Sequence, residues 1–133
     1  MELKDQVVSL ELAKKMKELG FEQDISQFVW VADSNTKKYK IIGNSAGEFC
    51  RWRTNFIACG GDDKDYGWYS AYTVAELGEM LKRHKNYMPK YYDYKWRCAI
   101  KDVSFSEDTE ADVRAKMLIY LKENNLLKEE HHG

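Results

Sequence analysis

The chain has 133 residues, of which 44% are hydrophobic and 14% are aromatic, and its formal net charge is −1. A length of this order predicts one domain with a core of its own. The near balance of 21 basic and 22 acidic residues excludes a general nucleic-acid coat protein and a polybasic membrane binder.

The cysteines and the apolar runs indicate in which cellular compartment the protein is expected. Cys50, Cys59 and Cys98 are odd in number and widely spaced, which is typical of free thiols in a reducing cytosol. They form no metal-binding motif, and we expect them to be buried, unreactive thiols. The first residues do not resemble a secretory leader, and no apolar run reaches membrane-spanning length. We therefore expect a cytoplasmic protein without a membrane partner.

The first half of the chain changes from a helical period to a strand period. Residues 9–19 predict a helix with Ser9 as its cap, and Gly20 follows as its terminator. Residues 28–32 and 38–42 predict a hairpin around a turn at 33–36. Between 49 and 59, apolar residues at every second position predict a third strand. Residues 60–67 are glycine-flanked and acidic, and predict a loop.

The second half contains the clearest helix signals. Residues 68–72 predict a short strand, and a capping box of Thr73 and Glu76 begins a helix that ends near Arg83. Residues 91–101 form the longest alternating run and predict one half-buried antiparallel strand, which Val103 and Phe105 extend. A last helix begins at Asp108 or Thr109, with acids in its first turn, and ends near 124. Residues 129–133 predict a frayed tail.

These elements predict the fold class α+β. Because the strands cluster instead of alternating with helices, we expect a mostly antiparallel sheet of four to five strands, packed by three helices. One domain should span residues 1–128.

Three segments also resemble a known group of proteins. They are 9–21, which begins Ser9-Leu10-Glu11-Leu12-Ala13, then 73–81, Thr73-Val74-Ala75-Glu76-Leu77-Gly78-Glu79-Met80-Leu81, and then 108–121. In this order they are similar to small phage and prophage proteins from gut bacteria. The resemblance implies a phage or prophage origin, an accessory role and a bacterial cytoplasm. It carries over no activity, cofactor or site residue, and segment 22–70 lies outside it.

The basic and aromatic strand is the first candidate for function. Single-stranded nucleic acids bind surfaces on which bases stack on aromatic rings while cations follow the phosphates. The alternation opposes this role, because it places Tyr92, Tyr94 and Trp96 on the side opposite to the cations. A core strand with a solvated outer face explains the same pattern. The candidate nucleic-acid-binding residues are Lys90, Tyr91, Lys95, Arg97 and Lys101.

Two weaker patterns concern metal ions. Asp93 and Lys95 have the spacing of the D-x-K half of a PD-(D/E)-x-K nuclease, in which the acid holds Mg²⁺. A second acid in a recognisable frame is lacking, and solvated charges explain the pair. The acidic loop fails the ligand pattern of an EF-hand, so a solvated turn is the better interpretation. We predict neither a metal site nor a cofactor.

The remaining candidate is an aromatic surface for a protein partner. Tyrosine, tryptophan and arginine are enriched at the energetic centres of protein interfaces. An aromatic-rich core explains the same residues equally well. The candidate protein-binding residues are Arg51, Trp52, Arg53, Tyr66, Trp68 and Tyr69.

These patterns together favour a non-enzymatic accessory protein that binds a macromolecule. A host protein is the first partner to consider, with modulation of host machinery or host defence as the role. A nucleic-acid-binding module is the alternative, a metal-dependent nuclease is a remote one, and a homodimer stays open.

Overall fold

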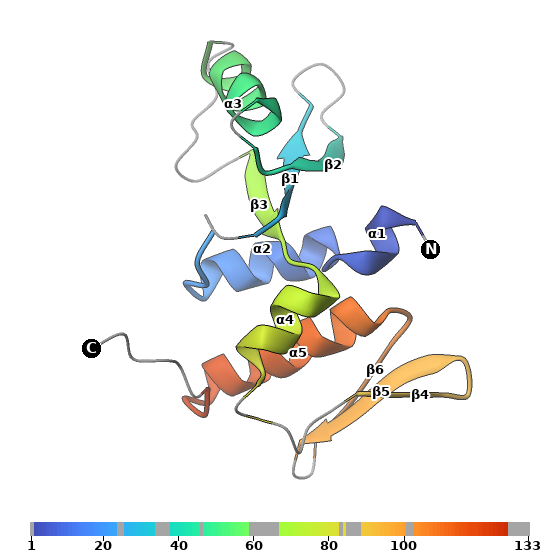
Figure 1. Cartoon of the computed structure of the whole chain (residues 1–133). Coiled ribbons are helices and arrows are strands. Elements are labelled where there is room, and N and C mark those ends of the chain that lie inside the picture. Colours follow the sequence, from blue (N-terminus) through green and yellow to red (C-terminus); the bar gives the residue numbers. More distant parts are fainter. Residues whose placement is uncertain are drawn as a thin grey trace.

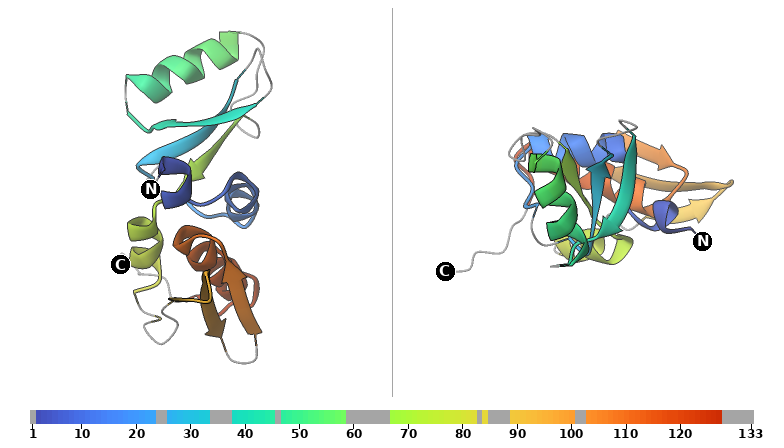
Figure 2. Two further views of the ribbon diagram at one scale, coloured as in Figure 1. Left: turned by 90° about the vertical axis from the view of Figure 1, so that its right-hand side faces the viewer. Right: turned by 90° about the horizontal axis from the view of Figure 1, so that it is seen from above.

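The computed structural model describes residues 2–23, 26–33, 38–45, 47–58, 67–82, 84, 89–100 and 103–127. Their helices and strands are stacked along one long axis (Figures 1 and 2). Helix α3 (Glu48–Ala58) lies at one end of the molecule. The opposite end consists of strands β4 (Lys90–Tyr92), β5 (Lys95–Ile100) and β6 (Val103–Glu107). A second sheet and the remaining helices lie between the two ends.

The class is α+β, as predicted, but the predicted single sheet is wrong in detail. The strands form two separate antiparallel sheets of three strands each. The described residues also contain five helices where we expected three. The sheets stay apart because helices pack between them, so that each sheet buries one face against its own cover.

The first sheet contains the predicted hairpin. It consists of β1 (Phe28–Ala32), β2 (Tyr39–Gly43) and β3 (Trp68–Ala71), in the order β2-β1-β3. Val29 lies opposite Ile42 on one side and Ser70 on the other, which places these side chains on one face. This face forms a small core beneath α3, made of Val29, Val31, Ile42, Phe49 and Trp68, with Trp52 packed against it.

The third predicted strand, 49–59, is wrong, because residues 48–58 form helix α3. Phe49, Trp52 and Phe56 follow the spacing i, i+3 and i+7, which places them on one helical face. Their rings stack, with centroids 5.9 Å apart for Phe49 and Trp52 and 4.9 Å apart for Trp52 and Phe56. The helix gathers all three rings on one side, whereas a strand would have turned Trp52 and Phe49 to opposite faces.

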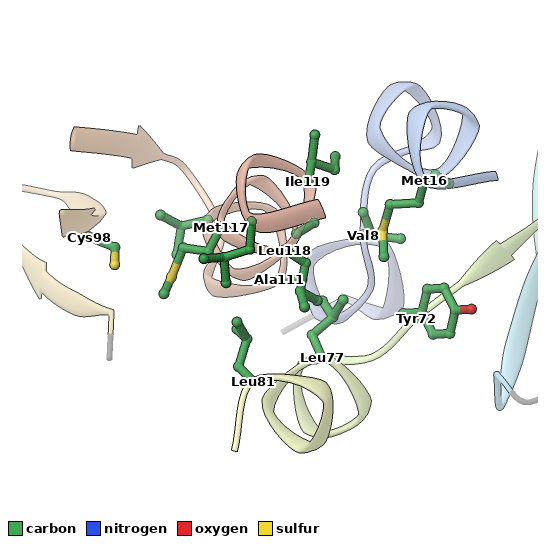
Figure 3. Packing of buried hydrophobic residues seen from close by; sticks show 14 residues of the cluster. Val8, Met16, Tyr72, Leu77, Leu81, Cys98, Ala111, Met117, Leu118 and Ile119 are labelled. Atoms are coloured by element: carbon green, nitrogen blue, oxygen red, sulfur yellow. The ribbon is translucent and has the colours of Figure 1, made fainter. Parts of the chain in front are cut away.

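The main core lies between the helices in the middle of the molecule (Figure 3). Helices α2 (Leu10–Glu18), α4 (Val74–Met80) and α5 (Glu110–Glu123) supply most of it, which confirms the three predicted helices. A short helix, α1 (Leu3–Gln6), precedes them. The fully buried side chains include Met16, Tyr72, Leu77, Met117 and Leu118.

The predicted helix caps are formed in two of three cases. The capping box is present, since the Thr73 backbone N–H donates to Glu76 Oε1 at 2.9 Å and the Glu76 N–H to Thr73 Oγ1 at 3.2 Å. Thr109 Oγ1 accepts from the Asp112 N–H at 3.2 Å. Ser9 occupies the cap position of α2 but its side chain forms no capping hydrogen bond. Its backbone N–H donates instead to Asp112 Oδ1 at 2.7 Å, which ties α2 to α5.

The second sheet replaces the single strand predicted for 91–101. The chain reverses at Asp93 and Tyr94, and β4, β5 and β6 pair in that order. Asp93 and Tyr94 both have positive φ, 53° and 62°, which is the backbone of a type I′ hairpin turn. Aspartate is common at the first of these positions, but tyrosine stands where the second usually has glycine, so the sequence signal of this turn is incomplete.

Some predicted features fall outside the described residues. They are the acidic residues of loop 60–67, the turn at 34–36 and the tail 129–133. None of the helices in the described ranges is both long enough and apolar enough to cross a membrane.

Candidate functional site: the β4–β5 hairpin

Three tyrosines of the β4–β5 hairpin are exposed to solvent. Tyr91 is 57% exposed, Tyr92 54% and Tyr94 88%. The prediction that Tyr92 and Tyr94 face the core is therefore wrong. The turn at 93–94 is the physical reason, because it ends the continuous alternation and folds β4 back beside β5. Tyr92 and Tyr94 therefore lie on the surface of the molecule and not in its packed interior.

The strand register gathers the cations on one face of the hairpin. Lys90 lies opposite Arg97, and Tyr92 lies opposite Lys95. Directly opposed residues share a face, so these four side chains lie on the same side of the sheet. We call them the cationic face: Lys90, Tyr92, Lys95 and Arg97. The alternation in the sequence predicted Tyr92 on the side away from the cations, and the hairpin brings it among them.

The side chains of the cationic face contact one another. The Arg97 guanidinium lies over the Tyr92 ring, 5.0 Å from its centroid. Arg97 Nε also donates to the Tyr92 carbonyl oxygen, at 3.5 Å. Lys95 forms an ion pair with Asp108 just beyond β6. The guanidinium is thus held against an aromatic ring that is itself open to solvent.

The opposite face of the same sheet anchors the hairpin to the helical core. Tyr91 and Trp96 contact each other with ring centroids 5.4 Å apart, and Phe105 contacts Tyr120 of α5 at 5.8 Å. Cys98 is buried on this face, and burial raises the pKa of its thiol, so the thiol stays protonated at neutral pH. The prediction of a buried thiol is confirmed for Cys98 but wrong for Cys50, which is exposed on α3.

The described aromatic rings of the other predicted surface are buried or half-buried. Trp68 is buried, and the indole Nε1–H of Trp52 donates to the Ala32 carbonyl at 2.8 Å. Tyr69 is half-buried, and Lys17 Nζ lies 5.1 Å from its ring centroid. Arg51 and Arg53 are exposed on α3, but no exposed aromatic ring among the described residues accompanies them.

Some predicted residues cannot be placed. Tyr66 and Lys101 lie outside the described residues. Asp93 belongs to the turn and Lys95 to β5, so the pair does not share one strand face as a nuclease half-motif would require. Within the described ranges, no group of three or more His, Cys, Asp or Glu side chains could hold a metal ion.

Tyr92 and Tyr94 were not expected on the surface. The alternation gave no signal for them, because it already placed the adjacent Tyr91 on the outer face and Tyr92 on the inner one. Comparison of the chain with protein-family models, with curated proteins and with solved structures finds no match.

Proposed function

We propose that this protein acts by binding a macromolecular partner, and that the β4–β5 hairpin is its contact surface. The observation that carries the proposal is the exposure of three tyrosines of this hairpin: Tyr92 within the cationic face, Tyr94 in the turn, and Tyr91 on the reverse side of β4. Exposed rings grouped with arginine and lysine are typical of recognition surfaces, since each ring offers a large, rigid contact area.

The turn conformation supports the same role. Tyr94 has a φ of 62° and an exposed fraction of 88%. A bulky residue in this left-handed region costs about 1 kcal/mol or more relative to glycine. An exposed ring makes too few contacts within the fold to offset that cost. A tyrosine at this position is better explained by contacts with a partner than by stability.

The resemblance described for the sequence gives the proposal its biological context. The resemblance of segments 9–21, 73–81 and 108–121 to small phage and prophage proteins favours an accessory protein in a bacterial cytoplasm. Modulation of host machinery or host defence is the corresponding role, and a host protein is one class of partner. The proposal is non-enzymatic, because the hairpin offers stacking planes and cations but no arrangement of acid, base and nucleophile.

The test is capture from bacterial lysate by the immobilised protein, with and without nuclease treatment. We compare the wild type with a variant carrying Tyr91→Ser, Tyr92→Ser and Tyr94→Ser. The control is Ile57→Ser, because Ile57 is 48% exposed on α3, at the far end of the molecule. A protein or nucleic acid retained by the wild type and the control, but lost from the triple variant, supports the proposal. Equal retention by all three proteins contradicts it.

A further inference from the structure

We infer that the ligand of the hairpin is a single-stranded nucleic acid. The inference rests on the proposed function and names the class of partner for the same surface. It depends on three features of the hairpin: two cations directly opposite each other, an aromatic ring held among the cations, and a second ring at the exposed tip.

The cations of this face are arranged for an anionic ligand. Lys90 and Arg97 lie directly opposite each other on neighbouring strands, a placement of like charges that destabilises a sheet. The other strand neighbour of Arg97 is Ser106, so no acid lies opposite it on either side. Within the described residues neither Lys90 nor Arg97 forms an ion pair with a carboxylate. Phosphates bound between the two side chains would remove the repulsion.

The aromatic rings are arranged for bases. The Tyr92 ring lies among Lys90, Lys95 and Arg97, with the guanidinium of Arg97 over it. Proteins that bind single strands combine such rings, on which bases stack, with cations that follow the backbone. Tyr94 extends the aromatic surface to the tip of the hairpin, where it is 88% exposed.

The same rings favour a single strand over a duplex. In a duplex the faces of the bases are stacked on one another, so a tyrosine ring reaches them only where the strands are open. A purely electrostatic duplex-binding surface would need the cations but not the tyrosines. The overall charge of −1 does not oppose the inference, because the relevant field is local to the hairpin.

The experiment measures binding of a labelled oligothymidylate of about 12 nucleotides by fluorescence anisotropy. A duplex of the same length and polyglutamate serve as competitors. We expect binding to the single strand, with competition by the duplex at least about tenfold weaker. The three cations of the cationic face should each neutralise one phosphate, and each neutralised phosphate of a single strand contributes about −0.7 to the salt slope. The logarithm of the affinity should therefore fall with the logarithm of the salt concentration, with a slope of about −2.

Variants assign the binding to the cationic face. Tyr92→Ala should weaken binding about five- to 100-fold, and Arg97→Gln should reduce the salt slope by about 0.7. Arg51→Gln is the matched control, because Arg51 is an exposed arginine on α3 at the opposite end. Thermal unfolding midpoints equal to that of the wild type establish that both hairpin variants fold.

Three results would overturn the inference: no binding of the oligonucleotide at low salt, equal affinity for the duplex, or unchanged affinity in both folded hairpin variants. Displacement of the oligonucleotide by polyglutamate at equal charge would also overturn it in favour of an acidic protein. If the oligonucleotide does not bind but a nuclease-resistant protein is captured through the tyrosines, the inference fails and the proposed function stands. If neither is retained, both fail.

Discussion

The two aromatic groups of this molecule lie at opposite ends, and one is packed against a sheet whereas the other is exposed to solvent. At one end Phe49, Trp52 and Phe56 of α3 stack on one another, and Phe49 meets Trp68 of the first sheet edge-on; we call these three rings the α3 group. At the other end the tyrosines of the β4–β5 hairpin stand in solvent. Both groups adjoin arginines, so residue type does not distinguish them. Spacing does, because positions i, i+3 and i+7 turn the rings of α3 inward together, whereas a two-residue turn leaves hairpin rings on both faces.

The largest expected effect comes from removing a ring of the α3 group. Trp52→Ala deletes a half-buried indole, its contacts with two stacked neighbours and the hydrogen bond to the Ala32 carbonyl. We expect the free energy of unfolding to fall by about 3 kcal/mol, measured by urea denaturation. The matched change at the other end, Tyr94→Ala, should alter stability by less than about 0.5 kcal/mol. Similar losses for the two variants would abolish the distinction between the groups.

Gly67 offers a second way to test how tightly the α3 group is packed. Its φ is +95°, and a Cβ at this position would lie 2.6 Å from Cζ of Phe56. Gly67→Ala should therefore cost about 2 to 3 kcal/mol, from backbone strain together with displacement of a stacked ring. Chemical denaturation measures the loss.

Two other glycines separate these contributions. Gly20 has a φ of +90°, and a Cβ added to it would meet nothing within 4 Å, so Gly20→Ala should show the backbone cost alone, about 1 kcal/mol. Gly47 has neither constraint, and Gly47→Ala should be neutral within about 0.5 kcal/mol. Equal losses at Gly67 and Gly20 would show that the Phe56 ring moves aside freely.

Asp112 lies in the helical layer that joins the two ends. Its Oδ1 accepts from the Ser9 N–H at 2.7 Å, so Asp112→Ala should lower the free energy of unfolding by about 1 to 2 kcal/mol. Burial raises the pKa of its carboxyl, against the opposing hydrogen bonds from Ser9. A folded-state pKa above the unfolded value stabilises the fold below about pH 4. This contribution is lost as the pH rises through the raised pKa.

The matched variant is Asp112→Asn, which keeps an oxygen acceptor for the Ser9 N–H but does not titrate. Relative to the wild type, it should become progressively more stable as the pH rises above about 4, until the pH exceeds the raised pKa of Asp112. Urea denaturation at several pH values measures this difference. A difference that is constant with pH, or that falls as the pH rises, would contradict the assigned direction.

The sequence predicted the helical layer better than either end. Helices α2, α4 and α5 were expected from their apolar spacing and caps, and α4 carries a capping box, so local signals and packing agree. Helix α3 was missed because Cys50 and Thr54 fall on either side of Trp52 in a way that imitates alternation. Both are exposed in the helix, so their apparent place in an apolar pattern was accidental.

The candidate site was predicted in part. Lys90, Tyr91, Lys95 and Arg97 were named, but the alternation assigned Tyr92 and Tyr94 to the core. The reversal at 93–94 could not be found from local propensity, because tyrosine is unfavourable at a positive φ. Pairing of β5 with both β4 and β6 holds the turn in place, and this pairing is not visible in the alternation of a single strand.

The last prediction concerns a small gain in stability, expected when the two residues of this turn are replaced by those that a type I′ turn ordinarily contains. Asp93→Asn with Tyr94→Gly should raise the free energy of unfolding by about 1 kcal/mol, because both new residues adopt positive φ with less strain. Asp93→Asn alone is the control, and thermal or urea unfolding is the measurement. If the double variant is more stable but binds its partner more weakly, Tyr94 serves recognition at the expense of stability, whereas every ring of the α3 group serves stability. If stability falls, the Tyr94 ring makes contacts that hold the hairpin, and the contrast between the two ends is smaller than exposure alone indicates.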